Sequence, residues 1–175
     1  MKFRKPSAFI SFTLALLLPL MAVAQVTPLI FERAQIRIDS PPPREKDKTT
    51  KPTHPPVAYD TEVRPEDAMK LEYIHTLNTL TETNGVMIAF GAPSMVALPM
   101  MKVYSPVDAL FINDAGIVVQ ILPNVTLGQM AQEVLAHEPV KAFLFLKAGQ
   151  VAARGIRPQD VVAGSMFTPA PPVME

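Results

Sequence analysis

The stretch from Val107 to Leu122 reads Val-Asp-Ala-Leu-Phe-Ile-Asn-Asp-Ala-Gly-Ile-Val-Val-Gln-Ile-Leu. Two apolar runs flank the segment Asn113-Asp114-Ala115-Gly116, in which an aspartate starts a turn readily and Gly116 can take the positive φ of a bulged hairpin. Both runs are apolar at nearly every position. A strand that is apolar on both faces must be covered on both faces, so we predict a central hairpin with helices or another sheet on each side.

The first 24 residues have the pattern of a secretory signal peptide. Lys2, Arg4 and Lys5 form a basic region, residues 8–20 are apolar, and Ala22-Val23-Ala24 fits a cleavage site. We predict cleavage near Ala24-Gln25 and a periplasmic or secreted protein. The apolar run is shorter than the roughly 20 residues that span a bilayer, so membrane contact is expected only through an uncleaved signal segment, if at all.

Charge and cysteine content exclude some classes of protein. Loss of the signal peptide removes three of the 16 basic residues and none of the 16 acidic ones, which leaves a formal charge of −3. Nucleic-acid binding needs clustered Lys and Arg, so no nucleic-acid partner is expected. The chain has no cysteine, and a single hydrophobic core must therefore hold the fold without disulfides.

We expect one globular domain with two flexible segments. Residues 25–39 contain the first strand, and residues 57–163 form the remainder of the domain. Between them, residues 40–56 contain six prolines and no large apolar side chain, which predicts a flexible insertion with His54 exposed to solvent. Residues 164–175 are interpreted as a disordered tail.

Three segments are predicted to be helical. Residues 64–80 carry an apolar stripe with spacings of four, four and three, and residues 127–137 begin with the spacing of a capping box. Residues 150–154 are followed by Gly155, which suits a left-handed helix cap. The other apolar runs are typical of strands. The predicted fold class is α+β, a small, mainly antiparallel β-sheet or half-barrel with two to three short helices.

Several short motifs follow one another in the chain: Met101-Lys102, Pro106–Ile112, Asp114–Val119, Leu146–Gly149, Ala152–Ile156 and Asp160–Val162. Their order and spacing resemble the bacterial and archaeal "domain of unknown function 192" family. The resemblance covers residues 35–163, with the proline-rich segment as an insertion. It implies a small mixed domain dominated by β-strands, in a family whose members are often exported, and it implies no particular activity.

The chain departs from this family before and after the hairpin. Pro99-Met100 stands where the family usually has an aromatic pair, and Val103-Tyr104 stands where it usually has Asn-Thr. The cysteine that often follows the hairpin is absent. If this loop holds a ligand site in the family, the resemblance implies that the site is changed or lost here.

Lys102, Tyr104 and Asp108 are the candidate ligand-binding residues. Lys102 is the one charge in the apolar run 97–104, and an unpaired buried charge is too costly to keep. Its ammonium must therefore reach solvent or meet a carboxylate, for which Asp108 is the nearest candidate in sequence. The three residues converging on one pocket would mark a ligand site, or alternatively the site of a small periplasmic enzyme. No catalytic residue can be assigned, because no nucleophile motif is present.

Met95, Met100 and Met101 lie close together in sequence and suggest a second kind of site. Thioethers are soft ligands that select Cu(I), so a methionine-based copper-binding protein is a further alternative. Core packing is the competing interpretation, because methionine fills irregular gaps in many cores. The three histidines lack the spacing of a zinc site, and no cofactor is expected.

The function predicted from sequence is an exported, periplasmic domain that acts as a non-catalytic binding or scaffolding module. The prediction combines an apolar core, the lack of a reactive group of residues, and two proline-rich segments that can reach a partner. The expected partner is an unknown protein or small molecule of the cell envelope.

Overall fold

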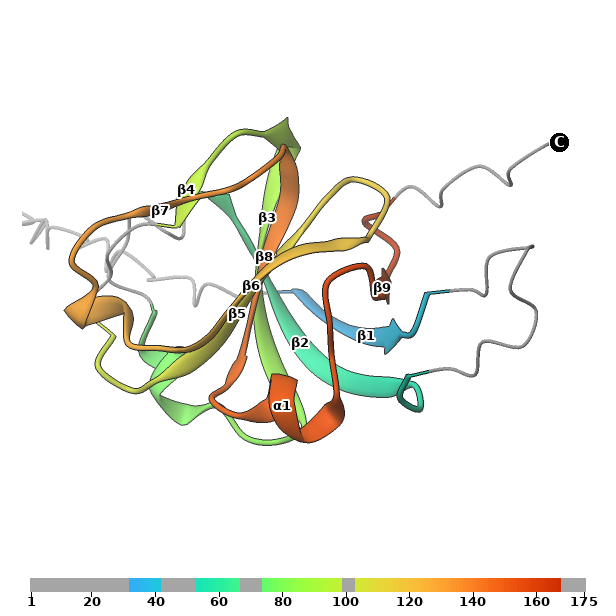
Figure 1. Cartoon of the computed structure of the whole chain (residues 1–175), viewed down its shortest axis with the longest axis horizontal. Coiled ribbons are helices and arrows are strands. Elements are labelled where there is room, and N and C mark those ends of the chain that lie inside the picture. Colours follow the sequence, from blue (N-terminus) through green and yellow to red (C-terminus); the bar gives the residue numbers. More distant parts are fainter. Residues whose placement is uncertain (1–31, 42–52, 67–73, 99–102, 168–175) are drawn as a thin grey trace, which may run out of the picture.

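The structure is a computed structural model that describes residues 32–41, 53–66, 74–98 and 103–167 (Figure 1). Within these ranges the chain is mostly β, with nine strands, one α-helix and two short 3₁₀ turns, Ile74–Thr79 and Leu127–Gln129. The remaining elements are β1 (Glu32–Asp39), β2 (Val57–Pro65), β3 (Asn84–Ser94), β4 (Ala97–Leu98), β5 (Val107–Ile112), β6 (Val118–Val125), β7 (Val134–Leu135), β8 (Val140–Lys147), α1 (Gln150–Arg154) and β9 (Val161–Ala163).

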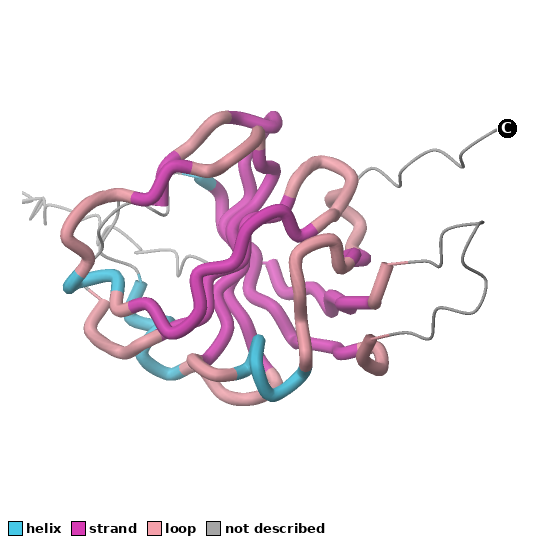
Figure 2. Tube along the Cα trace, viewed as in Figure 1, coloured by secondary structure: helices cyan, strands magenta, loops and turns pink. Residues whose placement is uncertain are grey.

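Seven strands form one curled sheet in the order β6-β5-β8-β3-β2-β1-β9, and β4 pairs with β7 in a separate ribbon (Figures 1 and 2). All pairs in the large sheet are antiparallel except β2 with β3. Hydrogen bonds also join its two edges, because the Val118 N–H donates to the Asp160 carbonyl and the Val162 N–H donates to the Gly116 carbonyl. The sheet is thereby closed into a barrel at this end.

The core consists of two apolar clusters on opposite faces of the same strands. The inner cluster draws side chains from all seven strands and from α1, for example Met87, Leu110 and Leu144. The outer cluster lies between β3, β5 and β8 on one side and the β4–β7 ribbon with the 3₁₀ turns on the other. Its centre is Phe143, whose ring lies 4.8 Å from that of Phe111 and 5.2 Å from that of Phe90.

β5 has no exposed residue, because it contributes to both clusters. The predicted hairpin is confirmed, since β5 pairs with β6 and Gly116 has φ of 77° in the turn. The turn is held by Asn113, whose side-chain oxygen accepts hydrogen bonds from the Ala115 and Ile117 N–H groups. The hairpin is central only in its first strand, because β6 lies at the edge of the sheet.

The predicted α+β class with two to three short helices is wrong. Only α1 is an α-helix among the described residues, and it matches the predicted segment 150–154 with its left-handed cap at Gly155. Residues 127–137 instead form a single 3₁₀ turn followed by β7. The Gly128 N–H donates to the Val103 carbonyl and the Ala136 N–H to the Val96 carbonyl, so these amides bind distant segments rather than a helix of their own.

The predicted helix over residues 64–80 is also largely wrong. Its first residues belong to β2, and Ile74–Thr79 is a 3₁₀ turn, while residues 67–73 lie outside the described ranges. β2 was not predicted, although its burial alternates along Val57, Tyr59 and Thr61, as expected of a strand with one face in the core. No helix in the described part of the chain is long and apolar enough to cross a membrane.

Three glycine substitutions test the closure of the barrel. A Cβ on Gly116 would lie 2.5 Å from the Val162 carbonyl oxygen, at a φ that disfavours other residues, whereas Gly149 has a similar φ of 86° but open space around it. Gly149→Ala should lower the free energy of unfolding by about 1–2 kcal/mol through backbone strain alone, and Gly116→Ala by more. Urea denaturation measures both.

Gly91→Ala is the matched control for this pair. Gly91 has neither a positive φ nor any atom within 4 Å of the added Cβ, so its free energy of unfolding should stay within about 0.5 kcal/mol of wild type. Equal losses for Gly116→Ala and Gly149→Ala would show that the contact with β9 does not constrain the barrel.

Candidate functional site

Polar residues gather at the end of the barrel where α1 packs. β5 begins at this end and β8 ends there, because the two strands pair antiparallel from Val107 to Lys147. α1 follows β8 directly, and the buried side chains of Val151 and Ile156 join the inner cluster. These contacts fix α1 against this end of the barrel, as Figure 1 shows for the backbone.

Asp108 anchors this end of the barrel. Its side chain is fully buried, and one carboxylate oxygen accepts a hydrogen bond of 2.8 Å from the Val151 N–H at the start of α1. The other oxygen accepts one of 2.8 Å from the N–H of Asn124, a residue with positive φ near the end of β6. A buried carboxylate is tolerable when both oxygens are satisfied, and here both are.

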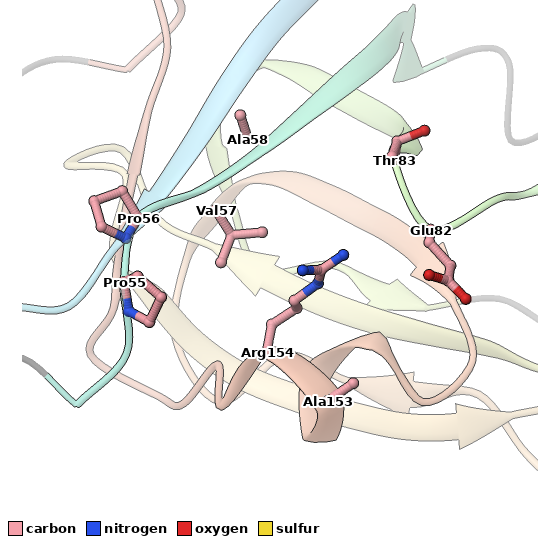
Figure 3. A pocket seen from close by; sticks show the side chains of 8 residues that line it. All are labelled: Pro55, Pro56, Val57, Ala58, Glu82, Thr83, Ala153 and Arg154. Atoms are coloured by element: carbon pink, nitrogen blue, oxygen red, sulfur yellow. The ribbon is translucent and has the colours of Figure 1, made fainter.

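A pocket of about 290 Å³ lies beside α1. We call it the α1 pocket; it is lined by residues 55–58, 82–83 and 153–154 (Figure 3). Arg154 is its one cationic lining residue, and no described carboxylate lies within 4.0 Å of the guanidinium. The Arg154 Nε donates a long hydrogen bond of 3.4 Å to the side-chain oxygen of Gln150, which leaves the outer N–H groups facing the pocket. An arginine in this setting can bind a carboxylate or phosphate.

Tyr59 lies behind Arg154 in the inner cluster. Only 1% of its surface is exposed, and its hydroxyl makes no hydrogen bond of normal geometry. Burial raises the pKa of Tyr59, and the carboxylate of Asp108 adds to this rise. The charge of the nearby Arg154 guanidinium and a poorly aligned contact of the hydroxyl with that side chain oppose it. The phenol therefore stays protonated and lies close to the side chain that reaches the α1 pocket.

His54 forms a buried ion pair with Asp160. The His54 Nε2 lies 2.8 Å from a carboxylate oxygen of Asp160, and its Nδ1 lies 2.7 Å from the Pro55 carbonyl oxygen. The Pro55 carbonyl can only accept, so Nδ1 donates to it, and a protonated ring also donates from Nε2 to the Asp160 carboxylate. Burial alone would lower the pKa of His54, but these hydrogen bonds and the charges of Asp160 and Asp39 outweigh it and raise the pKa.

The expectation that His54 is exposed is wrong, since its exposed fraction is 6%. The predicted insertion 40–56 is fixed at both ends in the described part of the chain. The Ser40 hydroxyl bonds to the backbone of His54 and lies 3.0 Å from the Thr53 hydroxyl. Residues 42–52, which were predicted to be flexible, lie outside the described ranges.

The structure describes two of the three predicted ligand-binding residues, and both lie apart from the α1 pocket. Lys102 lies outside the described residues, and Tyr104 is 66% exposed, with its ring beside Gly128. The two carboxylate oxygens of Asp108 accept hydrogen bonds from two backbone amides. Neither Tyr104 nor Asp108 lines the pocket.

The predicted copper ligands are described only in part. Met95 is 53% exposed, while Met100 and Met101 lie outside the described residues, so copper binding stays a prediction. Among the described residues, no group of three or more His, Cys, Asp or Glu side chains could hold a metal ion. The predicted signal peptide, residues 1–24, likewise lies outside the described ranges.

Sequence reasoning missed Arg154, Tyr59 and the role of His54. Arg154 was visible only as part of a helix and of a motif, and Tyr59 lay in a strand that was not predicted. The partner of His54 lies 106 residues away in the chain. The alternation of Val57, Tyr59 and Thr61 was the one local signal that could have revealed an inward-facing tyrosine.

A sequence model of the family DUF192, described as uncharacterized ACR, matches residues 58–164, which is more than half of the chain. Two solved structures are similar in fold. A "putative transcription regulator" from Sinorhizobium meliloti 1021 has 20% identity and a TM-score of 0.64, over 78% of this chain and 97% of that one. A protein of unknown function from Novosphingobium aromaticivorans DSM 12444 has 19% identity and a TM-score of 0.60, over 79% and 91%. No curated protein matches this chain.

Asp108→Asn tests the anchoring role of this carboxylate. The substitution keeps one acceptor but turns an amide N–H₂ toward the second backbone donor, which should lower the free energy of unfolding by about 1–3 kcal/mol. Asp114→Asn is the control, because the Asp114 side chain makes no hydrogen bond among the described residues, and its effect should stay within about 0.5 kcal/mol. Equal effects in urea denaturation would contradict the assignment.

A pH series tests the ion pair between His54 and Asp160. Because the pKa of His54 is raised above its ordinary value of about 6.5, its stabilising contribution is complete below that value and is lost as pH rises through the folded-state pKa. The difference in unfolding free energy between wild type and His54→Gln should therefore shrink as pH rises above about 6.5. A difference that grows with pH would indicate a neutral buried histidine instead.

Proposed function

We propose, for a chain that belongs to the uncharacterised DUF192 family, an exported and non-catalytic binding domain whose ligand site is the α1 pocket. The single observation that carries the proposal is Arg154, a cation that lines this pocket without a carboxylate partner in the described part of the chain. An arginine that is not needed for an internal ion pair is free to bind a ligand anion.

The chemistry of the neighbouring groups supports binding rather than catalysis. A general base needs a free lone pair, but both nitrogens of His54 donate to acceptors and both oxygens of Asp108 accept from backbone amides. Asp160 accepts from His54 and from the Arg157 N–H. These groups position the pocket walls and are not available for proton transfer.

The signal pattern of residues 1–24 supports export. Export would restrict the possible partners to molecules outside the cytoplasm. The mature chain would meet small solutes and proteins of the cell envelope. Its formal charge of −3 does not attract polyanions. The proposed partner is therefore a small molecule, or one group of an envelope protein, with a single anionic centre.

Native mass spectrometry of the full chain, expressed with its N-terminus in a Gram-negative host and released by osmotic shock, tests both parts of the proposal. The expected mass corresponds to a chain that begins at Gln25. A fraction of the protein should carry a small adduct that Arg154→Ala loses, because the charge-assisted hydrogen bonds to the ligand are gone.

Arg157→Ala is the matched control, because it removes the same charge from the turn after α1 without touching the pocket lining. It should keep the adduct. A protein that stays in the cytoplasm with residues 1–24 attached would overturn export. An adduct equally present in wild type and Arg154→Ala, or absent from wild type, would overturn the assignment of the α1 pocket.

A further inference from the structure

We infer that the α1 pocket selects a small zwitterion with an apolar side chain, of the kind that a free α-amino acid presents: its carboxylate to Arg154, its ammonium to Glu82 and its side chain to the proline wall. The inference rests on the proposed function and names the class of ligand that this site would take.

The pocket holds two opposite charges that do not neutralise each other. Arg154 and Glu82 both line it, yet no ion pair forms between them within 4.0 Å. Figure 3 shows the guanidinium between Val57 and Glu82, with the Glu82 carboxylate standing apart from it. A single anion would satisfy Arg154 but would be repelled by Glu82, whereas a ligand with both charges satisfies both side chains.

The remaining walls favour an apolar side chain on the ligand. Pro55, Pro56 and Val57 form one side, Ala58 and Ala153 add no polar side chain, and the Thr83 hydroxyl is the one polar group besides the two charges. The proline wall is rigid, because His54 beside it is tied to Asp160 and its Nδ1 bonds the Pro55 carbonyl. A volume of about 290 Å³ lies at the lower limit of ligand pockets, which suits a single small molecule.

Tyr59 gives a second observation at the same arginine. Its fully buried hydroxyl has the Arg154 side chain as a polar neighbour, but the geometry is too poor for a normal hydrogen bond, and such poorly satisfied groups are rare in folded proteins. The hydroxyl lies close to Arg154, whose guanidinium has donors to spare. A small shift of the guanidinium would satisfy the hydroxyl while its other donors hold a carboxylate. Tyr59 is thus a positioning residue that ligand binding would engage.

Titration of the ¹⁵N-labelled mature chain, followed by amide chemical shifts, tests the ligand class with four probes: L-leucine, isocaproate, isoamylamine and inorganic phosphate. Isocaproate is leucine without its amine, and isoamylamine is leucine without its carboxylate. L-leucine should shift the amides of residues 57–58, 82–83 and 153–154, and each analogue should bind at least about tenfold more weakly than leucine.

Three variants assign the contacts. Arg154→Ala should weaken the binding of both leucine and isocaproate about tenfold, since both ligands carry the carboxylate. Glu82→Gln should weaken the binding of leucine but not that of isocaproate, which has no ammonium. Tyr59→Phe should change the stability of the free protein little, because only a poorly aligned contact with Arg154 is lost, but it should weaken the binding of leucine several-fold. Loss of stability in Tyr59→Phe, or an equal effect of Glu82→Gln on leucine and isocaproate, would overturn the corresponding contact.

The outcomes separate this inference from the proposed function. Two results would overturn the zwitterionic ligand but not the proposed binding domain. One is that phosphate binds at the pocket more tightly than leucine. The other is that no probe binds while the adduct that Arg154→Ala removes is still present. No response to any probe together with no adduct would overturn both.

Discussion

The rest of this structure depends on a buried negative charge at the start of a strand that has no exposed face. β5 lies between two apolar clusters, so the Asp108 carboxylate cannot reach water and must be satisfied by the protein. The fold satisfies it with the backbone amides of Asn124 and Val151, which come from the segments that follow β5 and β8 along the chain. One charge therefore sets where β6 ends and where α1 begins. Because Arg154 is the last residue of α1, the same carboxylate determines where the pocket has its cation.

The parts of the fold that could be predicted are those whose signal is local. The hairpin was predicted from two apolar runs and a turn ending at Gly116, and α1 from a short segment closed by Gly155, and both are confirmed. The parts that failed depend on distant partners. Residues 127–137 have the spacing of a helix, but their amides bind the carbonyls of Val103 and Val96, which no local pattern reveals. β2 escaped notice because its alternation is brief and ends at Pro65, which was interpreted as the start of a helix.

The site shows the same limit at the level of side chains. Asp108 was named as a candidate partner of Lys102 and a candidate ligand-binding residue, yet its carboxylate oxygens bind backbone amides, whose positions follow only from the three-dimensional path of the chain. His54 was expected in solvent because its neighbours in sequence are polar or proline. Its environment is set instead by Asp160, which is brought to it by the pairing of β9 with β1. Arg154 and Tyr59 lie in different segments and become neighbours only when α1 packs on the barrel.

The proline-rich segment connects the fold to the proposed site, because its last residues line the α1 pocket. Ser40 and His54 hold the two ends of the segment together, and the ion pair between His54 and Asp160 fixes them to the turn before β9. That turn also takes part in closing the barrel against β6, because the Asp160 carbonyl accepts from the Val118 N–H and the Gln159 N–H donates to the Val118 carbonyl. Pro55 and Pro56 follow directly and form a wall of the α1 pocket, so the rigidity of this wall comes from the barrel closure and not from the prolines alone. In the proposed binding site, one wall is fixed by barrel closure, and the helix that carries the exposed Arg154 is placed by a buried carboxylate. Such a site discriminates by geometry and charge, which fits a recognition role better than a reactive one.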